Sequence, residues 1–188
     1  RDRFPELQGL MGGKYPLAEG EPPAVALAVQ QHYQPRGADD DLPSSDAGAL
    51  VALAERLELL LSIFAKGERP TGSSDPYALR RAGNGILQIL WERSWRLDLH
   101  ELLQQASRQW AALLPNFAID VVQLQADLEE FLRQRLISQL EEQGEAIDLV
   151  QAVTAESANQ RLLQDPLDAM DRLLSLIHIS EPTRQASI

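Results

Sequence analysis

Four basic side chains between residues 66 and 81 have the types and spacing to contact phosphate groups: Lys66, Arg69, Arg80 and Arg81. The two adjacent arginines follow Asp75 and Pro76, residue types that begin helices, so we expect the helix that opens there to carry both. The amino end of a helix is positively polarised, and lysine and arginine are common contacts to backbone phosphates. The four residues are therefore predicted as candidate phosphate contacts.

An ion pair is the competing interpretation of the two arginines. One of them can pair with Glu55 or Glu58 of the preceding helix, while the other stays solvated. The net charge of −11 argues against a nucleic-acid-coating surface over the whole chain. Residues 47–95, however, contain six Lys and Arg against five Asp and Glu, whereas both flanking stretches are acidic. Both interpretations stay open from the sequence pattern.

Two helices are expected to position these side chains. Residues 47–65 are almost entirely apolar, so we predict a helix that is buried over most of its circumference. Residues 66–75 contain glycine and proline and cannot continue it. A second helix is predicted over residues 76–93, where Gly83 and Gly85 indicate a close contact with another helix.

Further helices are predicted on both sides of this pair. An amino-terminal helix begins near Pro23, and Asp98 with Glu101 has the spacing of a helix capping box. A long amphipathic helix covers residues 121–140, and another helix begins at Asp165 and Pro166. The fold class predicted from these patterns is all-α.

Catalytic and metal-binding patterns are not found. The glycines at 67 and 72 have the spacing of a phosphate-binding P-loop, but Ser73 occupies the position of its lysine. His32 and His100 lie on separate segments, which is too little for a zinc site. The absence of cysteine excludes disulfides, zinc-thiolate sites and cysteine nucleophiles. No catalytic residue and no metal site are therefore predicted.

Composition indicates a folded part of a longer protein. The hydrophobic content of 44% is typical of globular proteins, and no apolar run reaches the about 18 residues needed to span a membrane. The chain begins without Met and without a signal peptide, so we interpret it as a fragment. From about residue 176 the amphipathic pattern stops. Residues 176–188 resemble a translated sequencing adaptor, so they are predicted to be a non-native tail.

Several ordered blocks resemble the β subunit of bacterial tetrameric glycyl-tRNA synthetase. The most specific block is Gly67-x-x-Pro70-Thr71-Gly72-Ser73-x-Asp75-Pro76-x-Ala78-Leu79-Arg80-Arg81-Ala82. Other blocks agree in order and spacing, namely Phe4-Pro5-Glu6-Leu7-Gln8-Gly9, Tyr33-x-Pro35-Arg36, Asp41-Leu42-Pro43 and Leu97-Asp98-Leu99. One departure lies on the predicted buried helix, where the family's usual Asp-Lys-Leu-Asp reads Glu55-Arg56-Leu57-Glu58.

The resemblance implies an HD-like helical domain over residues 1–112. A helical region leading into an anticodon-binding domain is implied over residues 113–175. In that family the α subunit activates glycine with ATP and magnesium, and the β subunit binds tRNA-Gly. The chain is thus expected to be a cytoplasmic part of a glycine–tRNA ligase heterotetramer, with no cofactor of its own and no membrane partner. Lys66, Arg69, Arg80 and Arg81 become candidate tRNA contacts. A metal-dependent HD-type phosphohydrolase and a purely structural helical scaffold remain the alternatives.

Overall fold

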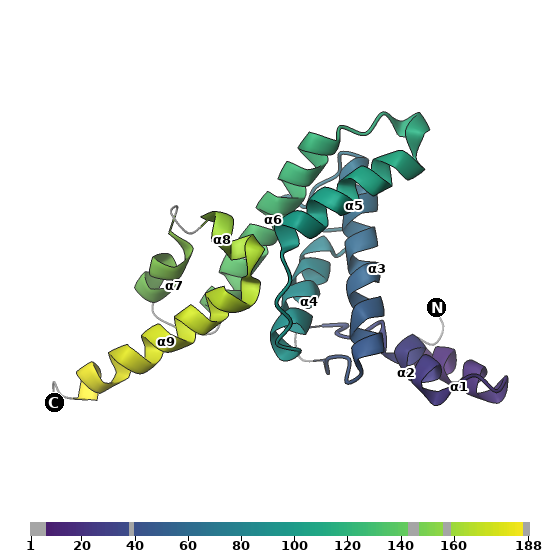
Figure 1. Ribbon diagram of the computed structural model, residues 1–188, viewed down its shortest axis with the longest axis horizontal. Helices are drawn as coiled ribbons and strands as arrows, with labels where there is room; N and C mark the ends of the chain where they lie inside the picture. The colour runs from purple at the N-terminus through teal and green to yellow at the C-terminus, as the bar shows by residue number, and fades with distance from the viewer. Residues whose placement is uncertain (1–6, 38–39, 143–146, 156–158, 186–188) are drawn as a thin grey trace. The chain divides into compact units, whose positions relative to one another are not determined.

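The structure is a computed structural model that describes residues 7–37, 40–142, 147–155 and 159–185. Within these ranges the secondary structure is helical, and the β pairing is limited to a single bridge between Thr71 and Ser74. Figure 1 shows the helices in chain order. The predicted all-α fold is confirmed, while its HD-like arrangement stays a prediction from the resemblance.

The chain forms two compact units. The first unit contains residues 1–62 and 70–93, and the second unit contains residues 63–69 and 94–188. The predicted boundaries at residues 112 and 175 refer to domains of the family and stay a prediction. None of the helices in the described ranges is long and apolar enough to cross a lipid bilayer.

The first unit begins with a helical hairpin, α1 (Leu10–Ala18) and α2 (Pro23–Gln31), whose two helices pack together. Gly9 precedes α1 with a φ of 82°, and a Cβ at this residue would lie 2.7 Å from the Gln30 carbonyl oxygen. Only glycine fits this backbone approach without strain.

Helix α3 (Asp46–Ala65) agrees with the predicted helix in its bounds but not in its burial. Leu50 and Val51 are 58% and 46% exposed, whereas Arg56 is only 8% exposed. The expectation of burial over most of the circumference is thus wrong. The helix presents an apolar face to solvent and buries a cation, because the guanidinium finds hydrogen-bond acceptors inside the unit.

Helix α4 (Leu79–Glu92) begins three residues later than predicted. The Asp75 carboxylate accepts hydrogen bonds from the backbone N–H groups of Leu79 (2.8 Å) and Arg80 (3.0 Å), as its helix-starting role requires. Pro76, however, lies before the helix. Ala78 has a φ of 56°, and this left-handed residue interrupts the helical path between Pro76 and Leu79.

The second unit is built on α5 (Leu99–Leu113) and α6 (Val121–Glu142), which pack together and are joined through the short 3-10 helix η2 (Pro115–Phe117). The predicted cap of α5 is confirmed, since the Asp98 carboxylate accepts the Glu101 N–H at 2.9 Å. Phe64 and Phe131 make an edge-to-face ring contact with centroids 5.2 Å apart.

Three helices complete the second unit: α7 (Ile147–Thr154), α8 (Asn159–Gln164) and α9 (Pro166–Gln185). Pro166 is the first residue of α9, and the Asp165 carboxylate accepts the Asp168 N–H at 3.1 Å, as predicted. Helix α9 continues without a break past residue 176, and the non-native origin of residues 176–188 stays a prediction.

Candidate functional site

Arg80 and Arg81 lie on the helix that the sequence predicts for them, and because α4 starts at Leu79 they are in its first turn. The Arg80 side chain is half-buried, and the Arg81 side chain is exposed. Arg81 Nη1 donates a hydrogen bond to the Arg36 carbonyl oxygen at 3.1 Å. In the described part of the chain, neither arginine forms an ion pair with Glu55, Glu58 or any other carboxylate. Among the described residues, both cations are therefore outside any ion pair.

Arg81 lines a groove of about 470 Å³ that belongs entirely to the first unit. We call it the Arg81 groove. Its lining combines three arginines, two glutamates and two tyrosines with smaller residues: Gln8, Tyr33, Pro35, Arg36, Glu55, Arg56, Glu58, Leu59, Tyr77, Ala78, Arg81 and Ala82. Such a mixture of donors, carboxylates and aromatic rings suits a polar ligand that carries negative charge and hydroxyl or amino groups.

Arg56 forms the buried base of the Arg81 groove. Its guanidinium donates to four carbonyl oxygens, at 2.9 Å to Ala52 and Pro35, 3.2 Å to His32 and 3.3 Å to Tyr33. Burial lowers the pKa of the Arg56 guanidinium, and the neighbouring Glu55 charge opposes that effect. Because its acceptors are neutral carbonyls, the cation is held in place without being neutralised.

Gly85 of α4 provides the space for the Arg56 side chain. A Cβ at residue 85 would lie 2.6 Å from Arg56 Nε and 3.2 Å from Arg56 Cδ. Such distances are shorter than van der Waals contact, so only glycine fits here. The predicted close contact at Gly85 is therefore confirmed, with the arginine side chain of α3 as its partner.

Arg36 stands at the edge of the groove and forms an exposed ion pair with Asp40, with Arg36 Nε 2.9 Å from Asp40 Oδ2. Hydrogen bonds from the Arg36 side chain lower the pKa of the Asp40 carboxyl to about 2. The same contact raises the pKa of Arg36. Its second guanidinium contact, Nη2 to Asp40 Oδ1 at 3.0 Å, makes the pair bidentate.

Lys66 and Arg69 belong to the second unit, so the structure describes the four predicted residues as two separate pairs. Lys66 is exposed. Arg69 Nη1 donates to the Phe64 carbonyl oxygen at 2.8 Å, Arg69 Nη2 contacts the Asp127 carboxylate, and the guanidinium lies 4.1 Å from the Phe64 ring centroid. Arg69 Nη1 also donates to the Glu68 carbonyl oxygen at 2.8 Å, so Arg69 has internal contacts of three kinds, whereas Lys66 is presented to solvent.

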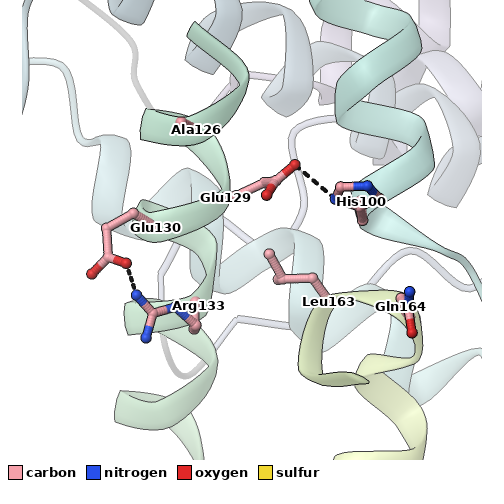
Figure 2. Close-up of a pocket in the computed structure, with 7 residues that line it drawn as sticks. All are labelled: His100, Ala126, Glu129, Glu130, Arg133, Leu163 and Gln164. Atoms are coloured by element: carbon pink, nitrogen blue, oxygen red, sulfur yellow. Dashed lines mark ion pairs between the residues drawn. The ribbon is translucent and has the colours of Figure 1, made fainter. Parts of the chain in front are cut away.

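A second pocket, of about 450 Å³, lies within the second unit between α5, α6 and α8. His100 Nδ1 is 2.9 Å from Glu129 Oε1, and Figure 2 shows these two side chains pointing toward each other. Glu130 instead points away from His100 and pairs with Arg133. Among the described residues, no three His, Cys, Asp or Glu side chains come together as a metal site would require. The pocket therefore offers one acid–base pair rather than a metal centre.

Two residues of the Arg81 groove were missed as site residues by the sequence prediction. Arg56 appeared only as a departure from the family pattern. Within the predicted helix over residues 47–65, however, it is the one charged residue that lies off the stripe of Glu55, Glu58 and Ser62. That displacement is a usable signal, because a charged residue on an apolar face needs a partner. Arg36 had no signal in periodicity, since it lies in a loop.

Comparison with known proteins agrees with the resemblance. The sequence pattern of the family described as glycyl-tRNA synthetase beta subunit matches residues 2–155. The glycine–tRNA ligase beta subunit of Acaryochloris marina is 48% identical over 172 residues, which cover 90% of this chain and 24% of the relative.

Two further glycine–tRNA ligase beta subunits are similar. That of a Picosynechococcus species is 44% identical over 188 residues, covering 98% of this chain and 26% of the relative. That of Desulfitobacterium hafniense is 42% identical over 161 residues, covering 84% of this chain and 23% of the relative. The chain thus spans about a quarter of the length of the curated relatives that it matches. It belongs to the glycyl-tRNA synthetase beta subunit family.

Proposed function

We propose that this chain is a tRNA-binding part of glycine–tRNA ligase, and that the Arg81 groove with Arg80 contacts the phosphate backbone of tRNA-Gly. The observation that carries the proposal is the position of Arg81. It is exposed in the first turn of α4 and lines a groove, and in the described part of the chain its side chain donates a hydrogen bond to a neutral carbonyl oxygen. An uncompensated guanidinium at a helix amino end is well suited to a phosphate oxygen.

The surroundings of Arg81 support this assignment. Arg36, Arg56 and Arg81 line the groove together with Glu55 and Glu58. Because Arg36 is paired with Asp40, the two remaining arginines equal the two glutamates in number. The whole chain carries a net charge of −11. A groove in which the charges are balanced repels a polyanion less than the acidic remainder of the chain does, and its unpaired arginines can contact phosphates.

The second pair of candidates receives different roles in the proposal. Lys66 is exposed and available for a further phosphate contact. Arg69 supports the segment after α3 through Phe64 and Asp127. We assign Arg69 a positioning role, since its two terminal nitrogens already have acceptors.

The remainder of the enzyme is part of the same proposal. The chain would act with an α subunit in a heterotetramer that attaches glycine to tRNA-Gly. ATP and magnesium would be used by the α subunit, in the cytoplasm, and this chain would supply RNA binding rather than a reacting group. A metal-dependent phosphohydrolase has no supporting cluster in the described residues.

Reversal of the two α4 charges tests the proposal. Arg80→Glu with Arg81→Glu, introduced into the intact β subunit, should raise the Kd for tRNA-Gly by about 10-fold or more and reduce its dependence on salt concentration. Binding is measured by fluorescence anisotropy over a salt series. Circular dichroism checks that helicity is retained.

The matched control is Arg108→Glu with Arg161→Glu, which changes the net charge equally at two exposed positions outside the groove. It should weaken tRNA binding much less. Equal tRNA binding by the folded Arg80 and Arg81 variant and the wild type would contradict the proposal. The segment would then be assigned a structural scaffold role.

A further inference from the structure

The two carboxylates of the Arg81 groove need an explanation in a site for a polyanion. Glu55 and Glu58 are exposed and line the groove together with Arg36 and Arg81. A carboxylate repels phosphate, so a groove that contacted phosphates alone would bind better without these two side chains. Their presence indicates a ligand that also carries hydrogen-bond donors.

Within the described residues, both carboxylates keep oxygen atoms that can accept hydrogen bonds from a ligand. Glu58 accepts a hydrogen bond from the Ser62 hydroxyl at 3.0 Å, which leaves its second oxygen available. Within the described residues, Glu55 and Glu58 form no ion pair. An ionised carboxylate can only accept hydrogen bonds, and an arginine can only donate them. The groove therefore presents acceptors and donors to the same ligand.

A ribonucleotide matches both kinds of group. Its phosphate oxygens accept hydrogen bonds from arginine, and its 2′-hydroxyl donates to a carboxylate. The groove volume of about 470 Å³ is within the range of ordinary ligand sites and is large enough for part of one strand. A deoxyribonucleotide has the phosphate but lacks the 2′-hydroxyl.

We propose that Glu55 and Glu58 accept hydrogen bonds from ribose 2′-hydroxyl groups, so that the Arg81 groove selects RNA over DNA. The inference rests on the proposed function, because it requires RNA in this groove. Arg81 supplies affinity for any nucleic-acid backbone, and the two glutamates supply the discrimination. Exocyclic amino groups of the bases also donate hydrogen bonds, but DNA carries them too, so they would give no such discrimination.

The test compares three strands of one sequence on the intact β subunit: single-stranded RNA, the same strand with 2′-fluoro groups, and the same strand as DNA. A 2′-fluoro group cannot donate a hydrogen bond. Wild type should bind RNA about 3- to 10-fold more tightly than the 2′-fluoro strand, as the loss of one or two hydrogen bonds implies. Glu55→Ala with Glu58→Ala should remove most of this difference.

The controls separate the inference from the proposed function. Glu92→Ala removes an exposed carboxylate of α4 that is not part of the groove lining, and it should keep the RNA preference. Arg81→Ala should weaken binding of all three strands by a similar factor. Glu55→Met with Glu58→Met, which keeps the side-chain length but offers no oxygen acceptor, serves as a second variant if the alanine variant does not fold.

Two results would overturn the inference and leave the proposed function intact. One is equal affinity of wild type for RNA and the 2′-fluoro strand, while the Arg80 and Arg81 variant still loses tRNA binding. The other is a glutamate variant that binds all strands more tightly by the same factor, since the carboxylates would then only repel phosphate. Unchanged tRNA binding by the arginine variant would overturn both.

Discussion

Two arginines of the Arg81 groove and the ion-paired arginines of the second unit differ in whether a carboxylate is among their acceptors. In the Arg81 groove of the first unit, Arg56 donates to four backbone carbonyls and Arg81 donates to a fifth. In the second unit, four arginines form ion pairs with carboxylates: Arg69 with Asp127, Arg96 with Asp165 and Asp171, Arg133 with Glu130, and Arg172 with Asp168. A carbonyl positions the guanidinium and leaves its charge, whereas a carboxylate positions it and neutralises it.

This difference shows how a chain with a large negative net charge can hold arginine side chains outside ion pairs. The chain has 28 Asp and Glu against 17 Lys and Arg, so carboxylates are the more abundant charged groups. Even in the first unit, Arg36 pairs with Asp40 and Arg93 lies 3.5 Å from Asp46. Among the described residues, Arg56 and Arg81 form no ion pair. Their side chains donate hydrogen bonds to carbonyl oxygens of the loop after α2. Whether an arginine of the groove forms an ion pair therefore depends on the tertiary packing around it.

The largest expected effect comes from disturbing the carbonyl-held cation. Gly85→Ala would place a Cβ 2.6 Å from Arg56 Nε, and the Arg56 side chain is held by four hydrogen bonds and cannot move aside cheaply. We expect a loss of about 2–3 kcal/mol in the free energy of unfolding, as for overpacked cores. Urea denaturation of the chain, followed by circular dichroism, measures it.

Gly37→Ala is the matched control for Gly85→Ala. A Cβ at Gly37 would meet no atom within 4 Å, and no positive φ requires glycine there. Its unfolding free energy should stay within about 0.5 kcal/mol of wild type. Similar losses in the two variants would show that Arg56 is not tightly held.

Removal of a carboxylate-held arginine should have a smaller effect on stability and little effect on RNA binding. Arg69→Ala deletes the contacts to the Phe64 carbonyl, the Phe64 ring and Asp127. The two ends of the ion pair are 29% and 28% exposed, so solvent screens the pair, and we expect a loss of about 1–2 kcal/mol. Urea denaturation and tRNA anisotropy measure the two effects.

Lys66→Ala provides the converse control in the same segment. Lys66 is exposed, so its removal should leave the unfolding free energy within about 0.5 kcal/mol of wild type. A strong loss of tRNA affinity in a stably folded Arg69→Ala variant would contradict the positioning role and make Arg69 a direct contact.

The smallest effect concerns Arg36 of the first unit, which is paired with Asp40. Hydrogen bonds from Arg36 lower the pKa of Asp40 from 3.8 to about 2. Because the folded-state pKa is the lower one, the stability from this pair is fully present above pH 3.8 and is lost as the pH falls through about 2. NMR titration of the Asp40 carboxyl should show the low midpoint.

Arg36→Ala should return the Asp40 midpoint toward its ordinary value, since the first cause of the shift is removed. The pH dependence of tRNA binding near neutrality should not change, because Asp40 is ionised there in both proteins. A midpoint near 3.8 in the wild type would show that the pair does not persist in solution.

Local signals in the sequence predicted much of the secondary structure. The Asp98 cap of α5, the start of α9 at Pro166 and the bounds of α3 follow from residues that are neighbours in the chain. The start of α4 was misplaced, because the left-handed Ala78 has no sequence signal comparable to a glycine. Capping by Asp75 was nevertheless predicted correctly.

The sequence by itself determined the all-α class, the family and the position of Arg80 and Arg81 at the start of a helix. Each of these depends on spacing along the chain. Only the tertiary structure decided that Arg56 is buried, that Gly85 makes room for it, and that Arg81 shares a groove with Glu55 and Glu58. The physical reason is that an arginine's acceptors are chosen in space: carbonyls of a loop more than 20 residues away hold Arg56, and periodicity carries no information about such contacts.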